Sequence, residues 1–180
     1  MADSGLTGVL LVGGASARFG SPKALARLRG ETLAERGWRT LGEACEERIA
    51  VGKGDLVLPF DVLVEPPEPQ APIAGVLAGL RAATNETAVF LPVDCPLVTP
   101  GLLRELGEQL AVPQTGPLPG AYAKHHVSEL ERRLAAGDYS LRGVNARVLQ
   151  ADPRLLLDAN TPTELSALEQ DLAALDEHRA

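Results

Sequence analysis

The sequence predicts a three-layer α/β protein, in which helices cover both faces of a doubly wound, mostly parallel sheet. Short apolar runs alternate along the chain with longer stretches whose apolar residues recur at helical spacing. Such alternation is typical of parallel strands joined by right-handed crossovers, which bring the carboxyl ends of the strands to one edge of the sheet. The 180 residues suffice for one domain with a sizeable core. We therefore expect a single Rossmann-like domain.

The first predicted strand, Val9–Val12, leads into the stretch with the clearest chemical pattern. It ends at Gly13-Gly14, where missing side chains let backbone N–H groups approach a ligand closely. Arg18 and Lys23 follow, and no acidic residue occurs over 4–30 although the net charge is -7. A cationic loop at the carboxyl end of a buried strand predicts a site for a polyanionic small ligand.

Two known phosphate-binding patterns do not fit this loop. Lys23 follows Pro22 and precedes Ala24, so the Gly-Lys-Ser/Thr ending of a Walker loop is missing. Adjacent glycines followed by a cationic segment also differ from the alternating glycines of a dinucleotide-binding loop. On these residues alone, a strand-to-helix turn with solvated cations stays an alternative.

The stretch resembles the signature loop of the MobA-like molybdopterin guanylyltransferases, which reads roughly Leu-x-Gly-Gly-x-Ser-x-Arg-Phe/Met-Gly-x-x-Lys-Ala-Leu. The matching positions are Leu11, Gly13, Gly14, Ser16, Arg18, Phe19, Gly20, Lys23, Ala24 and Leu25. The resemblance implies a fold of the nucleotide-diphospho-sugar transferase type. It also implies transfer of GMP from GTP to the terminal phosphate of molybdenum-bound molybdopterin, with release of pyrophosphate.

The same resemblance implies roles for the loop. The residues expected to bind the nucleotide are Leu11, Val12, Gly13, Gly14, Ser16 and Lys23. Arg18 and Lys23 are the expected catalytic cations, because charge develops on the α-phosphate and on the departing pyrophosphate. We expect one nucleotidyltransferase domain over 1–180, with its nucleotide-binding part at about 1–100 and its acceptor part at about 101–180.

The next segments continue the alternation. A helix is expected over Glu31–Cys45 with Thr32 as a cap, followed by short strands over Arg48–Val51 and Val62–Val64. In the family, an asparagine in the loop after the second strand helps to hold the nucleotide. Here that loop reads Val51-Gly52-Lys53, which leaves the base specificity open.

Glu65 ends the third strand and precedes a proline-rich segment. An acidic residue near this place takes part in guanine recognition in the family, and a carboxylate can accept hydrogen bonds from the N1–H and N2–H groups of guanine. A solvated acid at a strand end is the alternative. Ala71–Gly75 resembles the family's Gly-Pro-Leu-Ala-Gly segment beside the nucleotide, which makes Gly75 a nucleotide-binding candidate, but Ala71 replaces the first glycine. A helix should follow through Ala83.

Another apolar strand, Thr87–Val93, delivers Asp94 to the same edge of the sheet. Carboxylate oxygens bind Mg²⁺, the ion that accompanies nucleoside triphosphates. On position alone, a turn or cap residue is the alternative. The family's Pro-x-Asp-x-Pro motif, matched by Pro92, Asp94 and Pro96, implies that Asp94 is a catalytic residue, a nucleotide contact and the Mg²⁺ ligand. Cys95 is expected to pack rather than react.

The last part of the chain is expected to bind the acceptor. Its predicted elements are a helix from Thr99-Pro100 through Leu110, a returning edge strand over Gly120–Ala123, a helix over Leu130–Ala136 and a short strand over Leu155–Leu157. Family members usually show Asn-x-Asn-Thr-Pro next, with asparagines that contact molybdopterin, so Asp158 and Asn160 are the acceptor-binding candidates. Thr161, Pro162 and Glu164 fit a capping box at a helix start.

Composition bounds location and partners. Cys45 and Cys95 lack metal-ligand spacing, which favours a reducing compartment, and no signal segment or membrane-length apolar stretch is visible, so we expect a cytoplasmic protein. A pI near 5.0 and 3% aromatic residues argue against nucleic-acid binding. The resemblance implies GTP and molybdenum-molybdopterin as partners, with other proteins of molybdenum cofactor biosynthesis or a molybdoenzyme chaperone as further candidates.

Two other functions stay open. A cytidylyltransferase of the same fold, acting on molybdopterin or another phosphorylated acceptor, would keep the mechanism and change the base. Adjacent Gly13-Gly14 favours guanine, because the cytidylyl relatives more often show Ala-Gly. A non-catalytic molybdopterin carrier is the second alternative, and it is disfavoured because the departures from the family pattern lie outside the triphosphate loop.

Overall fold

A computed structural model of the chain describes residues 5–13, 20–54 and 56–177. The strands in these residues are β1 (Leu6–Leu11), β2 (Arg27–Leu28), β3 (Glu31–Thr32), β4 (Glu47–Gly52), β5 (Val62–Val64), β6 (Thr87–Pro92), β7 (Val112–Pro113), β8 (Gly120–Ala123) and β9 (Val148–Leu149). The α-helices are α1 (Leu33–Ala44), α2 (Pro72–Ala82), α3 (Pro100–Gln109), α4 (Val127–Ala135) and α5 (Pro162–Glu177). Short 3₁₀ helices are η1 (Lys23–Leu25), η2 (Lys124–His126) and η3 (Pro153–Leu156).

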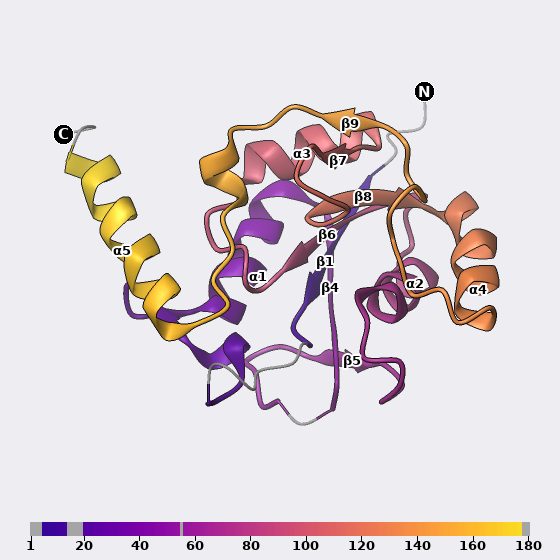
Figure 1. The fold of residues 1–180 in the computed structure, drawn as a ribbon, viewed down its shortest axis with the longest axis horizontal. Coiled ribbons are helices and arrows are strands. Elements are labelled where there is room, and N and C mark those ends of the chain that lie inside the picture. The colour runs from indigo at the N-terminus through magenta and orange to yellow at the C-terminus, as the bar shows by residue number, and fades with distance from the viewer. Residues whose placement is uncertain (1–4, 14–19, 55, 178–180) are drawn as a thin grey trace.

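The main sheet has five strands in the order β5-β4-β1-β6-β8 (Figure 1). Strands β5, β4, β1 and β6 run parallel, and β8 pairs antiparallel with β6 at the edge. Leu11 is in register with Val51 on one side and with Pro92 on the other. The three central strands therefore end level with one another. This topology confirms the mostly parallel sheet and its returning edge strand.

Helices cover both faces of this sheet, with α1 and α3 on one face and α2 and α4 on the other (Figure 1). Alternate residues of β1 pack against the helices on opposite faces of the sheet. Leu10 packs in a core cluster with Leu33 of α1, whereas Val9 packs in a second cluster with Ile73 of α2. A strand that is buried on both faces needs apolar side chains at consecutive positions, which explains why it appears in the sequence as one apolar run.

Side-chain caps fix the starts of α1 and α3. The Thr32 hydroxyl accepts a hydrogen bond from the Glu35 N–H at 3.1 Å, and the Glu35 carboxylate accepts one from the Thr32 N–H at 3.0 Å. Thr99 caps α3 by accepting from the Leu102 N–H at 3.3 Å. Both predicted caps are confirmed, and the segment before Leu33 forms β3 rather than the first turn of the helix.

The helix α5 begins with the predicted capping box. The Glu164 N–H donates to Thr161 Oγ1 at 3.2 Å, and the Thr161 N–H donates to Glu164 Oε2 at 3.1 Å. Leu165 and Leu168 on this helix are buried. The helix therefore anchors the segment before it, which contains the acceptor candidates, against the body of the protein.

The strand predicted over Leu155–Leu157 is wrong, because Pro153–Leu156 forms the 3₁₀ helix η3. The Asp152 carboxylate accepts a hydrogen bond from the Arg154 N–H at 3.0 Å, and a proline follows the cap, which together start a helical turn. A three-residue apolar run contains too little periodicity to distinguish a strand from a turn of helix. The two-residue strands β2, β3, β7 and β9 were not predicted either. None of the helices in the described part of the chain is long and apolar enough to cross a membrane.

Candidate active site

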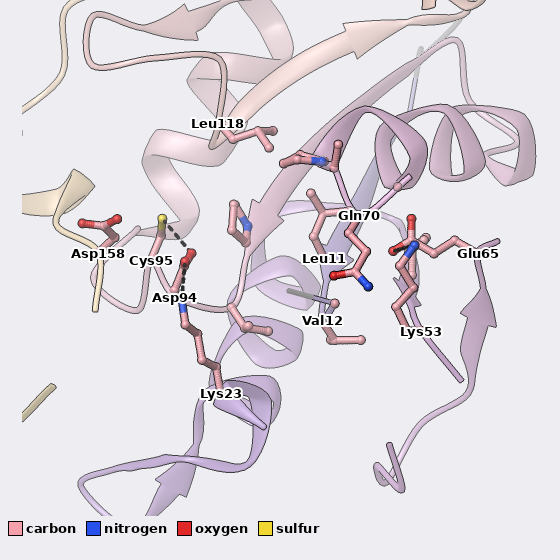
Figure 2. Close-up of a pocket in the computed structure, with 17 residues that line it drawn as sticks. Leu11, Val12, Lys23, Lys53, Glu65, Gln70, Asp94, Cys95, Leu118 and Asp158 are labelled. Carbon is pink, nitrogen blue, oxygen red and sulfur yellow. Dashed lines mark hydrogen bonds and ion pairs between the residues drawn. The ribbon is translucent and has the colours of Figure 1, made fainter. Parts of the chain in front are cut away.

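The carboxyl ends of β1, β4, β5 and β6 border one cavity of about 560 Å³ (Figure 2). The predicted site residues that line it are Leu11, Val12, Gly13, Lys23, Glu65, Gly75, Asp94 and Asp158. Asn160 lies beside it, hydrogen-bonded to two of these side chains. The predicted residues Gly14, Ser16 and Arg18 lie outside the described residues.

Backbone hydrogen bonds continue past the strand ends and hold the exit loops together. The Val12 N–H donates to the Val51 carbonyl at 2.9 Å, and the Val93 N–H donates to the Leu11 carbonyl at 3.1 Å. The segments that leave β1, β4 and β6 are thereby kept side by side. The chain places Gly13 and Asp94 at one edge of the sheet for this reason, as parallel topology requires.

At one end of the cavity, Lys23 joins two segments that are far apart in the sequence. Its Nζ lies 3.3 Å from Asp94 Oδ2 and donates to Asn160 Oδ1 at 2.7 Å. Asn160 Nδ2 in turn donates to Asp158 Oδ2 at 2.8 Å, and the Ala159 N–H donates to the Asp94 carbonyl at 2.8 Å. The side chains of Lys23 and Asp94 are only 14% and 25% exposed. We call this set of Lys23, Asp94, Asp158 and Asn160 the cationic end of the cavity, after Lys23; its two carboxylates outnumber that ammonium group and leave room for a divalent cation.

The carboxylates at the cationic end suit a hard divalent cation. Asp94 uses Oδ2 toward Lys23, while Oδ1 has a long contact to Cys95 Sγ at 3.7 Å. Mg²⁺ is ordinarily held by one or two carboxylates together with substrate phosphates. That mode needs no larger cluster, and the described residues contain no group of three or more His, Cys, Asp or Glu arranged to hold a metal.

Cys95 is a buried packing residue. Burial raises the pKa of its thiol, and the neighbouring carboxylates of Asp94 and Asp158 raise it further. A thiol in this setting stays protonated, and the thiolate is the reactive form of cysteine. The geometry agrees with the prediction that this side chain packs rather than reacts.

At the opposite end of the cavity, Glu65 and Lys53 meet (Figure 2). Glu65 Oε1 lies 3.5 Å from Lys53 Nζ, and the Glu65 side chain is only 8% exposed. Its second oxygen, Oε2, is buried and has no hydrogen-bond partner among the described residues. Burial raises the pKa of Glu65, and the positive charge of Lys53 acts in the opposite direction. The interpretation of Glu65 as a solvated acid is therefore wrong.

Two glycines make room for the Glu65 carboxylate. A Cβ added at Gly13 would lie 3.1 Å from Glu65 Oε1, and one added at Gly75 would lie 3.3 Å from Oε2. Both distances are shorter than ordinary van der Waals contact. We call Glu65, Lys53, Gly13 and Gly75 the carboxylate end of the cavity.

The replacement of glycine by Ala71 does not disturb the backbone here. Ala71 is the N-cap of α2, with φ −139° and ψ 146°, and extended backbone of this kind suits any residue. Pro72 follows at the first helical position, and both residues line the cavity. The departure at Ala71 is therefore conformationally neutral.

Residues 8–154 match the family model of the MobA-like NTP transferase domain. The chain belongs to the MobA-like NTP transferase family. It is therefore a nucleotidyltransferase, and the resemblance that the sequence indicated is confirmed.

Relatives in this family match nearly the whole chain. The molybdenum cofactor guanylyltransferase of Burkholderia orbicola is 32% identical, over 93% of this chain and 97% of that protein. A probable molybdenum cofactor guanylyltransferase of Chloroflexus aggregans is 28% identical, over 91% of this chain and 93% of that protein. The family pattern therefore extends beyond the signature loop.

The crystal structure of molybdopterin-guanine dinucleotide biosynthesis protein A from Archaeoglobus fulgidus has the same fold. It aligns with a TM-score of 0.76 over 93% of this chain and 99% of that chain, at 23% sequence identity. A likeness at this identity shows the fold, and it confirms the nucleotide-diphospho-sugar transferase type.

The structure adds cavity residues that the sequence did not single out. Lys53 is the main one, because it stands in the loop where the MobA-like family has its asparagine. Gln70 and Leu118 also line the cavity. The position of Lys53 after a strand adjacent to β1 was a usable signal, but an absent asparagine says nothing about what the replacing lysine contacts.

Proposed function

We propose that this nucleotidyltransferase transfers GMP from GTP to the terminal phosphate of molybdenum-bound molybdopterin, giving molybdopterin guanine dinucleotide and pyrophosphate. The observation that carries the proposal is the single cavity that joins a buried carboxylate, Glu65, to the Lys23–Asp94 pair. A nucleotide that lies along this cavity would bring its base to the carboxylate end and its phosphates to the cationic end. Relatives over nearly the whole chain are named as guanylyltransferases.

The reaction needs no covalent enzyme intermediate. An oxygen of the acceptor phosphate attacks the α-phosphorus of GTP, and the bond from that phosphorus to the oxygen bridging the β-phosphate breaks, so that pyrophosphate leaves. The protein supplies positioning and electrostatic stabilisation. The ammonium group of Lys23 would face the charge that develops on the α-phosphate and the leaving group, and the backbone of Gly13 would lie against the phosphates. The further roles of Arg18 and Gly14 stay predictions from the sequence.

The Lys23–Asp94 pair explains how a lysine is held ready for this task. Asp94 Oδ2 and Asn160 Oδ1 orient the Lys23 ammonium from two sides, so little reorganisation is needed when phosphates arrive. Asp94 would hold Mg²⁺, which supplies charge neutralisation for the triphosphate. Leu11 and Val12 line the same cavity and would contact the nucleotide.

The carboxylate end would read the base. Guanine offers two adjacent donors, the ring N1–H and the N2 amino group. The Glu65 carboxylate is an acceptor whose Oε2 has no hydrogen-bond partner in the described part of the chain. Gly75 and Gly13 leave the space that this carboxylate occupies. Residues of about 1–100 would thus form the nucleotide-binding part.

The acceptor would approach from the side of Asp158 and Asn160, in the part of the chain from about 101 to 180. Asn160 is bonded to Lys23, so a group that binds there touches the transferring centre directly. GTP and molybdenum-molybdopterin are the proposed substrates. A cytoplasmic location and partner proteins of cofactor biosynthesis stay predictions.

Pyrophosphate release tests this function. The purified protein is incubated with Mg²⁺ and each nucleoside triphosphate in turn, with and without molybdenum-loaded molybdopterin. Release only with GTP and acceptor is the expected result. Release with CTP instead would identify a cytidylyltransferase, and no release with any nucleotide would leave a carrier or another acceptor.

A further inference from the structure

The Lys53 side chain is 30% exposed, and its ammonium group contacts three acceptors of the protein. Its Nζ donates to the carbonyls of Pro66 and Pro69, the latter at 3.4 Å, and lies 3.5 Å from Glu65 Oε1. An ammonium group has three N–H donors and no acceptor. Three acceptors in the protein therefore use its donors, and the side chain is built to hold Glu65 and the proline segment that follows it.

Glu65 is left with one committed oxygen and one unused oxygen. Oε1 faces Lys53, whereas Oε2 is buried without a hydrogen-bond partner among the described residues, in a cavity that the carboxylate lines. A buried acceptor without a partner costs free energy, and such a group calls for a donor that arrives with a ligand. The carboxylate end is therefore incomplete until a ligand with N–H groups enters.

We propose that Lys53 is a positioning residue for base recognition: its ammonium group holds the Glu65 carboxylate in one orientation, so that it accepts hydrogen bonds from the N1–H and N2–H groups of guanine. The inference rests on the proposed function and assigns the lysine a task that the family's asparagine cannot perform, because an amide carries no charge. An ionised carboxylate accepts two donors, whereas its protonated form presents an O–H group to one of them. Cytosine offers one amino donor beside a ring acceptor and so mismatches this end.

The charge balance around Glu65 makes this role testable by pH. In the described part of the chain, Lys53 is the charged group that acts on Glu65. Gly13 after β1 and Gly75 on α2 lie against the same carboxylate. Burial raises the pKa of Glu65 and Lys53 opposes that effect. Without the lysine, burial acts alone, and the carboxyl group takes up its proton at a higher pH.

The test is GTP and CTP binding in the presence of Mg²⁺ by the wild-type protein and Lys53→Met at pH 7.5 and pH 6.0, with inorganic tripolyphosphate as a further ligand. We expect the variant to bind GTP about tenfold more weakly at the higher pH, as for loss of one charge-assisted contact, and weaker still relative to wild type at the lower pH. Tripolyphosphate binding should be the same in both proteins at each pH, because the cationic end is unchanged. Taking the ratio of variant to wild type removes the titration of the nucleotide's own phosphates.

Three further variants complete the design. Lys53→Arg keeps the positive charge and should recover most of the GTP affinity at pH 6.0. In a Glu65→Gln background, Lys53→Met should change GTP affinity little, because the group that the lysine serves is already gone. Arg132→Met on the exposed surface of α4 is the matched control for loss of a cation and should bind like wild type.

The outcomes separate this inference from the proposed function. Wild-type protein that prefers GTP over CTP, together with a Lys53→Met variant that binds GTP normally at both pH values, overturns the role of Lys53 alone. Equal losses of GTP and tripolyphosphate binding in the variant also overturn it, because the lysine would then support the whole cavity. Wild-type protein without a preference for GTP rejects the proposed base, and this inference with it.

Discussion

The two ends of the cavity contain similar residues but differ in how those residues are hydrogen-bonded. Each pairs one lysine with one carboxylate, Lys23 with Asp94 and Lys53 with Glu65. At the cationic end, Lys23 is also bonded to Asn160, which is bonded to Asp158, so the polar groups form a connected network. At the carboxylate end, the lysine donates to backbone carbonyls of the protein, and one carboxylate oxygen of Glu65 has no hydrogen-bond partner among the described residues.

This difference suits the cationic end to holding charges in place for the reaction, and the carboxylate end to recognising the ligand. A network whose members orient one another provides a fixed charge for a phosphate group and loses little on reaction. An unsatisfied acceptor in a tight site gains most when the matching donor arrives, and it penalises a ligand that brings the wrong group. The cationic end should therefore govern turnover, and the carboxylate end should govern which nucleotide binds.

The largest effect is expected from Lys23→Ala or Asp94→Ala. Each change removes charge at the transferring phosphates and should lower pyrophosphate release by about 1,000-fold, the upper range for loss of one electrostatic contact in an active site. Thermal unfolding should stay cooperative, because neither side chain belongs to the apolar core. The exposed Glu131→Gln on α4 is the control. Turnover at the wild-type rate in either variant would reject the assigned role.

Gly75→Ala tests the carboxylate end of the cavity. Its Cβ would lie 3.3 Å from Glu65 Oε2 and 3.0 Å from Leu11 Cδ2, so the carboxylate has to move. The KM for GTP should rise about tenfold while kcat changes little, since crowding of this size costs roughly 1–3 kcal/mol. Gly101→Ala on α3 is matched, because its Cβ would meet only Thr99 Oγ1 at 3.9 Å. A fall in kcat with an unchanged KM would contradict the division between the two ends.

Much of the fold was predictable because the central strands are buried on both faces. β1 and β6 appear as apolar runs, and the caps at Thr32 and Thr99 signal the helix starts. Leu155–Leu157 was mispredicted, since three apolar residues have no measurable period and the turn is set by Asp152 and the following proline. Local hydrogen bonds determine the conformation of such short segments, and the hydrophobic pattern of the sequence does not reveal these bonds.

The cationic end was also predictable in its members. Asp94 follows a buried strand and Lys23 follows the glycine loop, so parallel topology brings them to one edge. The bond from Lys23 to Asn160 was not predictable, because it joins residues 137 positions apart through a side-chain rotamer. Lys53 was missed for a similar reason: its role depends on where Glu65 and the proline segment fold back, which no local pattern encodes.

Asn160→Ala tests whether the network at the cationic end matters as a unit. The change removes the 2.7 Å bond to Lys23 and the partner of Asp158. We expect the KM for molybdenum-molybdopterin to rise roughly tenfold, as for loss of a hydrogen bond to a charged group, with GTP binding almost unchanged. Asp158→Asn keeps a side-chain oxygen for Asn160 and should affect the acceptor KM less. A selective loss of GTP binding in Asn160→Ala would place this residue with the nucleotide instead.

The smallest effect concerns stability. Burial raises the folded-state pKa of Glu65, so the folded protein favours the protonated carboxyl group. The stability that this protonated group contributes is lost as the pH rises through the raised pKa. Glu65→Gln removes this titration and should raise the thermal midpoint slightly at pH 8 relative to wild type. The difference should vanish in acid, below the pKa of the unfolded chain, where Glu65 is protonated in both states. A lower midpoint for Glu65→Gln at pH 8 would mean that the Lys53–Glu65 pair stabilises the folded chain by more than the buried charge costs. The sequence departure at Lys53 would then serve the fold as well as the base.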